Sequence, residues 1–133
     1  MLLAVGCSIK AAYKFLQTPT EISAIEIVKV CEDETTGEIE QTTISTIDDI
    51  ETFLKDFLQV DCHLIYTDPT GIGDNVLVIK IIYKDGEYEL IDSGGQSKYT
   101  EERGFRYYSG HRSFDKTEFK NLISKYSEEQ SEN

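Results

Sequence analysis

The segment from Val76 to Tyr83 constrains the fold most, because every residue in it except Lys80 is apolar. Alternate side chains of a strand point to opposite faces of a sheet. The apolar residues of this segment fall on both faces: Leu77, Ile79, Ile81 and Tyr83 on one, and Val76, Val78 and Ile82 on the other. Such a pattern predicts a central strand that is covered on both sides.

Several other segments predict strands around this one. Ile22–Val30 is rich in isoleucine and valine and predicts a first strand. A turn at residues 34–37 leads from it to a second strand at Glu38–Ile44. Asp85-Gly86 favours the positive φ values of a tight hairpin turn, so the central strand is expected to pair with the segment that follows it. The remaining expected strands are Asp61–Tyr66, Glu87–Asp92 and a segment near Phe105–Tyr108.

Two segments follow the 3.6-residue period of an amphipathic helix. In the first, Thr46 is the expected N-cap. The apolar face of this helix consists of Ile47, Ile50, Phe53, Leu54, Phe57 and Leu58. The second helix is expected to begin at Asp115, because Asp115 and Glu118 match a capping box and Phe114 can pack against Phe119. Its inward stripe consists of Phe119, Leu122, Ile123 and Tyr126.

These elements predict an α+β fold, with a mainly antiparallel sheet of five to six strands and two helices packed on it. The expected order is β-β-α-β-β-β-(β)-α. With 133 residues, of which 39% are hydrophobic and 29% charged, the chain fits one globular domain. We assign this domain to residues 21–126. Residues 1–20 are expected to be a signal remnant or lipid anchor with a tether, and residues 127–133 a disordered acidic tail.

The chain is strongly acidic: 25 Asp and Glu residues against 13 Lys and Arg give a net charge of −12 at pH 7. This charge repels nucleic-acid phosphates and anionic bilayers, so neither is an expected partner. No run of about 18 apolar residues occurs, and so no transmembrane helix is expected. Any attachment to a membrane would therefore depend on a lipid anchor.

The first seven residues, Met1-Leu2-Leu3-Ala4-Val5-Gly6-Cys7, form a short apolar run that ends in small residues and a cysteine. This pattern resembles the end of a bacterial lipoprotein signal, in which the cysteine carries the lipid. The resemblance implies lipid attachment at Cys7 and a place on the outer face of the cytoplasmic membrane. The alternative is an apolar N-terminus with an incidental thiol, which would leave the protein in the cytoplasm.

Several motifs of the expected domain point to one group of proteins. They are Thr46–Ile50, Cys62-His63, Asp68–Gly71, Tyr88–Ile91, Gly104–Tyr108 and Phe114-Asp115-x-x-x-Phe119. Together with the isoleucine-rich first strand, these motifs resemble those of small surface lipoproteins of Gram-positive gut bacteria. The likeness extends from Glu21 to Tyr126. It implies a surface-anchored protein and no particular chemistry.

The residues that could carry chemistry do not form a catalytic or metal-binding pattern. Cys62 and His63 are consecutive on an expected strand, so their side chains point to opposite faces and cannot act as a nucleophile and its base. The two histidines and three cysteines lack the spacing of a zinc site, and the glycine pair at 94–95 lacks the lysine of a P-loop. We therefore expect no enzyme activity, no cofactor and no metal.

Cys31 and Cys62 form an even pair once Cys7 is assigned to the lipid. Outside the cell they could form a disulfide, provided that the strands carrying them are neighbours. The alternative is a pair of partly buried thiols, a common environment for cysteine.

Residues 96–113 contain four basic and two acidic residues, against the acidic trend of the chain. Aromatic residues are interspersed among these charges, and Arg and Tyr together are typical of binding surfaces. The candidate ligand or partner surface consists of Arg103, Arg106, Tyr107, Tyr108, His111 and Arg112. In the alternative interpretation, Phe105 and Tyr107 complete the core and the arginines pair with surrounding carboxylates.

The sequence thus favours a non-enzymatic, envelope-anchored binding or structural module, acting as a monomer on an unidentified extracellular ligand or protein. The alternative is a soluble acidic inhibitor or immunity-type protein, since negative charge favours rapid capture of a basic protein. The chemical state of Cys7 distinguishes these two hypotheses.

Overall fold

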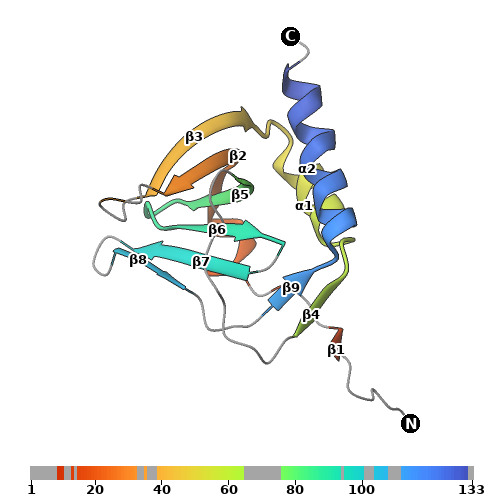
Figure 1. Ribbon diagram of the computed structural model, residues 1–133, viewed down its shortest axis with the longest axis horizontal. Coiled ribbons are helices and arrows are strands. Elements are labelled where there is room, and N and C mark those ends of the chain that lie inside the picture. Colours follow the sequence, from red (N-terminus) through yellow and green to blue (C-terminus); the bar gives the residue numbers. More distant parts are fainter. Residues whose placement is uncertain are drawn as a thin grey trace.

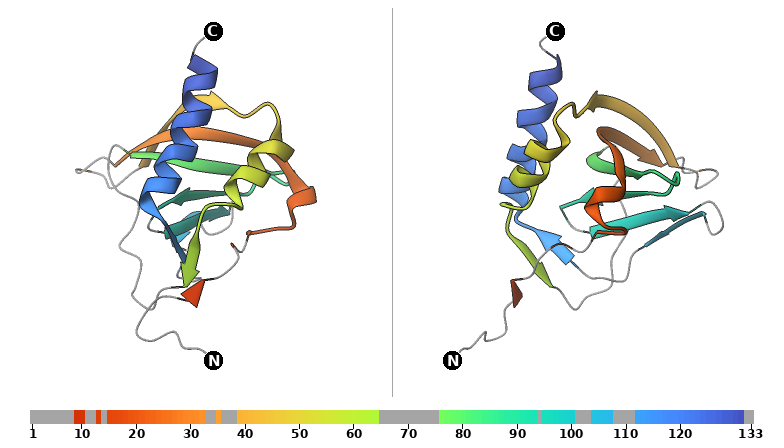
Figure 2. Two further views of the ribbon diagram at one scale, coloured as in Figure 1. Left: turned by 90° about the vertical axis from the view of Figure 1, so that its right-hand side faces the viewer. Right: turned by 180° about the vertical axis from the view of Figure 1, so that it is seen from behind.

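The computed structural model describes residues 9–10, 13, 15–32, 35, 39–64, 76–93, 95–100, 104–107 and 112–131. Within these residues, the fold consists of a six-stranded antiparallel sheet, a three-stranded antiparallel sheet and two α-helices (Figure 1). The helices lie beside each other on one side of the curved large sheet (Figure 2). The α+β fold predicted from the sequence is confirmed.

The large sheet has the strand order β3-β2-β5-β6-β7-β8. Its strands are β2 (Ile22–Glu32), β3 (Ile39–Thr46), β5 (Val76–Tyr83), β6 (Tyr88–Asp92), β7 (Gly95–Thr100) and β8 (Gly104–Tyr107). The small sheet, in the order β1-β4-β9, consists of β1 (Ile9–Lys10), β4 (Cys62–Leu64) and β9 (Arg112–Phe114). The helices are α1 (Ile50–Phe57) and α2 (Lys116–Ser131), and a 3₁₀ turn, η1 (Pro19–Glu21), precedes β2.

β5 lies inside the large sheet, between β2 and β6, as its two apolar faces predict. On the face toward the helices, Ile79 and Ile81 are fully buried and belong to the main core. On the opposite face, Val78 is also fully buried. It belongs to a smaller cluster of buried residues that consists of Val28, Val30, Val78 and Leu90. The prediction of a strand covered on both sides is confirmed.

The main core fills the space between the large sheet and the helices. α1 contributes Phe53 and Phe57, and α2 contributes all four residues of its predicted stripe. The rings of Phe53 and Tyr126 meet edge-on with their centroids 4.9 Å apart, which joins the two helices directly. Because an isolated helix of eight residues is marginal in water, α1 depends on this packing for its stability.

α1 begins later than the sequence pattern predicts. Its N-cap is Asp49, whose carboxylate accepts a hydrogen bond of 3.0 Å from the backbone N–H of Thr52. The expected N-cap, Thr46, is instead the last residue of β3 and pairs with Glu26. The expectation that Leu58 belongs to the apolar face is also wrong, because Leu58 follows the helix and is 53% exposed.

α2 begins as predicted, with Asp115 as its capping residue. The Asp115 carboxylate accepts a hydrogen bond of 2.9 Å from the backbone N–H of Glu118, and the rings of Phe114 and Phe119 lie 5.3 Å apart. The Glu118 carboxylate, however, accepts a hydrogen bond from the backbone N–H of Asp61. Glu118 therefore connects the start of α2 to the chain that leaves α1. The helix continues to Ser131, within the tail that was expected to be disordered.

The segment before β2 is part of the fold, in contrast to the expected tether at residues 8–20. β1 pairs with β4 through Ile9 and Lys10, and the side chain of Tyr13 is only 7% exposed. Tyr13 packs against aromatic residues that lie far away in the sequence, and a pattern confined to neighbouring residues does not reveal such contacts.

The remaining strands agree in part with the sequence pattern. The hairpin between β5 and β6 is confirmed, with Gly86 at φ +95° in the turn. The third expected strand lies in the small sheet, as β4, and its last two expected residues lie outside the described part of the chain. β7 and β9 were not expected, because both are short and polar. No helix in the described part of the chain has the length and apolar character needed to cross a bilayer.

Candidate functional site

Three of the six residues of the predicted basic and aromatic surface lie in described strands of the two sheets. Arg106 and Tyr107 lie in β8, at the edge of the large sheet, whereas Arg112 begins β9 in the small sheet. Arg103, Tyr108 and His111 lie outside the described residues, as does Cys7. The structure describes only the backbone at Arg106, Tyr107 and Arg112, so this binding surface stays a prediction.

The disulfide between Cys31 and Cys62 required neighbouring strands, and the structure does not provide them. Cys31 lies in β2, which pairs with β3 and β5, and Cys62 lies in β4, which pairs with β1 and β9. The side chain of Cys62 is 5% exposed and belongs to the main core. Strand pairing therefore gives the disulfide no support.

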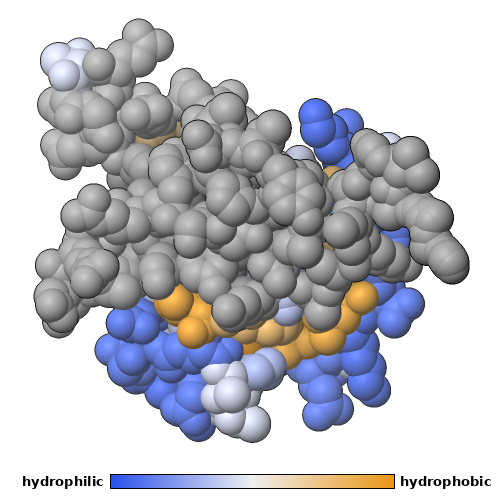
Figure 3. Space-filling model, turned by 90° about the horizontal axis from the view of Figure 1, so that it is seen from below, coloured by the Kyte–Doolittle hydropathy of each residue, from blue (hydrophilic) through white to orange (hydrophobic). Residues whose placement is uncertain are grey.

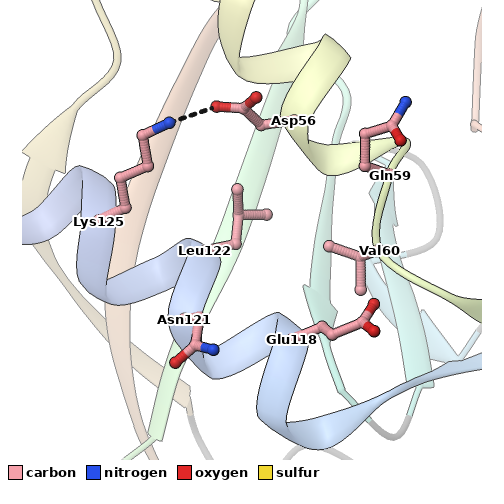
Figure 4. A pocket seen from close by; sticks show the side chains of 7 residues that line it. All are labelled: Asp56, Gln59, Val60, Glu118, Asn121, Leu122 and Lys125. Carbon is pink, nitrogen blue, oxygen red and sulfur yellow. Dashed lines mark hydrogen bonds and ion pairs between the residues drawn. The ribbon is translucent and has the colours of Figure 1, made fainter.

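A groove of about 290 Å³ lies between α1 and α2 (Figure 4). Its lining comes from both helices and from the turn after α1, and consists of Asp56, Gln59, Val60, Glu118, Asn121, Leu122 and Lys125. Val60 and Leu122 lie between Asp56 at one end and Glu118 at the other (Figure 4). The groove thus has an aliphatic floor and a carboxylate at each end.

Asp56 is held in place by two side chains of α2. Its Oδ2 accepts a hydrogen bond of 2.5 Å from the Tyr126 hydroxyl and one of 3.0 Å from Lys125 Nζ. The hydrogen bond from Tyr126 and the ion pair with Lys125 hold the pKa of Asp56 below its usual value. The side chains of Lys125 and Asp56 are 54% and 33% exposed, so this ion pair contributes at most about 1 kcal/mol and is easily exchanged.

The opposite end of the groove is fixed by the backbone around Asp61. Glu118 Oε1 accepts a hydrogen bond of 2.9 Å from the Asp61 N–H, and the Asp61 carbonyl accepts one of 3.0 Å from the Asp115 N–H. The groove therefore combines a fixed shape with an aliphatic floor, the Glu118 carboxylate and the Asp56–Lys125 ion pair.

A second cluster, around Glu89 on β6, is closed from solvent. Glu89 is fully buried, on the face of the sheet that borders the main core. Glu89 Oε1 accepts a hydrogen bond of 2.5 Å from the Tyr13 hydroxyl. Oε2 accepts one of 2.8 Å from the Leu16 backbone N–H and another from the Tyr83 hydroxyl. These donors stabilise a carboxylate that would otherwise be costly to bury.

The tyrosines of this cluster remain protonated over a wide range of pH. Burial, followed by the charge of Glu89, raises the pKa of Tyr13 and of Tyr83 well above its usual value. Both hydroxyls therefore stay hydrogen-bond donors at neutral pH. No pattern of neighbouring residues predicts this cluster; its one signal in the sequence is a glutamate flanked by Tyr88 and Leu90 in a short apolar strand.

The chain just after Tyr13 is attached to the β5–β6 hairpin as well. Gln17 Nε2 donates hydrogen bonds of 3.0 Å to Asp85 and 2.8 Å to Glu87. Together with Leu16 and Tyr13, Gln17 holds this segment against the large sheet. We call Tyr13 and residues 15–17 the strap.

Other surface features are less developed in the described part of the chain. Seen from below, a narrow hydrophobic strip lies beside hydrophilic residues (Figure 3). Among the described residues, no three His, Cys, Asp or Glu side chains gather in a way that would hold a metal ion. Within the described part of the chain, the groove between α1 and α2 and the cluster around Glu89 are the features used below to infer function.

Comparisons of the chain with known protein families, characterised proteins and solved structures give no match.

Proposed function

We propose that this protein is a non-enzymatic binding module, and that the groove between α1 and α2 receives basic side chains of a protein partner. The observation that carries the proposal is the aliphatic floor of Val60 and Leu122 between the carboxylates of Asp56 and Glu118. Lysine and arginine carry a charged head on an apolar stem, so they match such a groove along their length.

The charge of the whole chain supports the same kind of partner. A net charge of −12 attracts a basic protein over long distances and raises the rate of encounter. At the opposite end of α1 from the groove, Asp48, Asp49 and Glu51 add exposed carboxylates to this acidic surface. Because the Asp56–Lys125 pair is partly exposed, a basic side chain of the partner can replace Lys125 at little cost.

A synthetic peptide in which lysine alternates with leucine is a suitable probe of the groove, with a lysine–serine peptide of equal charge for comparison. Titration calorimetry should give tighter binding of the lysine–leucine peptide, because only that peptide can cover both the acidic and the apolar surface. Equal affinity for the two peptides would show attraction by net charge alone and would contradict the proposal.

A pair of variants locates the contact. Asn121→Lys places a positive charge in the groove lining, whereas Thr117→Lys places the same charge elsewhere on the exposed side of α2. We expect Asn121→Lys to weaken binding of the lysine–leucine peptide about tenfold, or about 1.4 kcal/mol. Thr117→Lys should weaken it by less than about threefold, since exposed charges outside the contact are screened by salt. Equal losses would overturn the assignment of the groove.

We further propose the outer face of the cytoplasmic membrane as the place of action, with a lipid on Cys7. The support is the resemblance of residues 1–7 to the end of a lipoprotein signal. Mass spectrometry of the N-terminal peptide from native cells tests this, since a diacylglyceryl group adds a large and characteristic mass. An unmodified thiol would favour the soluble acidic inhibitor instead, and would leave the groove proposal intact.

A further inference from the structure

Tyr13 connects Glu89 to both walls of the groove. Its ring lies edge-on to Phe57, with centroids 5.2 Å apart, and next to Phe114, with centroids 5.7 Å apart. Phe57 is the last residue of α1, and its carbonyl accepts a hydrogen bond of 3.1 Å from the Val60 N–H. Phe114 directly precedes Asp115, which caps α2. Tyr13 therefore contacts both the residue that ends α1 and the residue that precedes the cap of α2.

We propose that the strap regulates the groove: when Tyr13 is docked on Glu89, it fixes the ends of α1 and α2, and when it leaves, the groove loosens. This inference rests on the proposed function only for its effect on partner binding. The coupling of the strap to the helix ends stands on the contacts of Tyr13 themselves.

The contacts favour two discrete states of the strap over gradual loosening. Tyr13 and Leu16 bond to different oxygens of one buried carboxylate, so departure of the strap removes two of the three donors described above. A buried charge without donors is costly, and water has to enter when the strap leaves. Close packing of Tyr13 with Phe57 and Phe114 then transmits the change to the helix ends.

Coupling of this kind acts in both directions. If a docked strap favours the binding-competent groove, then a partner in the groove must favour the docked strap by the same factor. Tyr13 lies six positions after Cys7, and β1, which pairs with β4, lies between them.

Amide exchange followed by NMR tests the coupling without any partner. Tyr13→Phe removes one hydroxyl and keeps the ring, and Tyr88→Phe removes a hydroxyl from the opposite face of the same sheet, where Tyr88 accepts a hydrogen bond from Gln41. We expect Tyr13→Phe to speed exchange of the Leu16 amide about tenfold, and of the Val60 and Asp115 amides severalfold. Tyr88→Phe should leave all three rates unchanged.

The outcome for Val60 and Asp115 decides the proposal. Faster exchange at Leu16 alone would mean that the strap moves without affecting the groove, and would overturn the coupling. Equal effects of Tyr13→Phe and Tyr88→Phe would mean general destabilisation, and would overturn it too. Glu89→Gln provides a second variant with the same expected pattern, because it removes the charge that holds the strap and keeps the side-chain shape.

Binding of the lysine–leucine peptide separates this inference from the proposed function. We expect Tyr13→Phe to bind the lysine–leucine peptide about fivefold more weakly than Tyr88→Phe does. If the wild-type protein does not bind the peptide, the proposed function fails, and the exchange rates still decide whether the strap controls the helix ends. If the peptide binds both variants equally, regulation by the strap is wrong while the groove proposal remains.

Discussion

The Tyr13 hydroxyl donates a hydrogen bond of 2.5 Å to the Glu89 carboxylate, 76 positions further along the chain. Both side chains are buried, so solvent does not compete for either partner while the strap is docked. A buried polar group that loses its partner costs about 1–3 kcal/mol, more than most surface ion pairs contribute. We therefore expect the stability of the fold to depend strongly on this contact.

Replacement of Glu89 by alanine should lower the free energy of unfolding by about 3 kcal/mol or more, because the buried hydroxyls of Tyr13 and Tyr83 both lose their acceptor. Urea unfolding followed by circular dichroism measures the change. Glu40→Ala removes the same group from an exposed position on β3 and should change stability by less than about 0.5 kcal/mol. Equal stability of the two variants would contradict the role given to Glu89.

The raised pKa of Tyr13 and of Tyr83 predicts that the folded protein loses stability at alkaline pH. Their pKa is raised in the folded protein, whereas unfolded phenols ionise at about pH 10. The stability that this shift contributes is present below about pH 10 and is lost as the pH rises further. Of the eight tyrosines, we expect at least two to show phenolate absorbance only when the protein unfolds. Ionisation of all eight with an unchanged circular dichroism spectrum would refute this.

The lowered pKa of Asp56 predicts a loss of stability at acid pH. Its pKa is lowered by the hydrogen bond from Tyr126 and by Lys125, so its contribution is present above its unfolded pKa of about 4 and is lost as the pH falls below that. Asp56→Asn should be slightly less stable than the wild type at pH 7 and equally stable at about pH 2. Urea midpoints across this range give the comparison, and a difference independent of pH would argue against it.

Capping of α1 can be tested by two alanine substitutions. Asp49→Ala should lower the free energy of unfolding by about 1 kcal/mol, because the Thr52 N–H and hydroxyl both lose the carboxylate that they contact. Thr46→Ala, at an exposed position that ends β3, should cost clearly less. Thermal unfolding of the two variants distinguishes them. A larger loss for Thr46→Ala would restore Thr46 as the cap.

Two consecutive residues should differ sharply in their effect on the core. Phe57 is 1% exposed and contacts Tyr13, Phe15, Phe53 and Phe114, so Phe57→Ala should cost about 3–5 kcal/mol. Leu58 is 53% exposed, so Leu58→Ala should cost less than about 1 kcal/mol. Chemical denaturation measures both. Similar losses would mean that the boundary of α1 has been misplaced.

The parts of the fold that could be predicted depend on interactions between neighbours in sequence. The alternation in Val76–Tyr83, the Asp85-Gly86 turn and the capping residue Asp115 all act within a few positions, and the structure confirms each of them. The helix period also located the buried residues of α2. Local geometry dictates these features, so the printed sequence contains the information needed to find them.

The parts that were missed depend on distant partners. Tyr13 is buried because Glu89, Phe57 and Phe114 surround it, and no pattern near residue 13 reveals them. The groove likewise arises where α1 and α2 meet, from residues that each look like ordinary members of a helix or turn. Both Thr46 and Asp49 can cap a helix. Only the pairing of Thr46 with β2 decides between them.

The short β1 strand has a consequence for attachment to a surface. Ser8 alone separates Cys7 from Ile9, which pairs with Leu64 of β4. One intervening residue spans at most about 7 Å between the cysteine and the first paired residue. A molecule attached through Cys7 would therefore have no flexible linker before its first paired strand. The small sheet would then lie next to the bilayer headgroups, and the rest of the domain would keep a restricted orientation relative to the membrane.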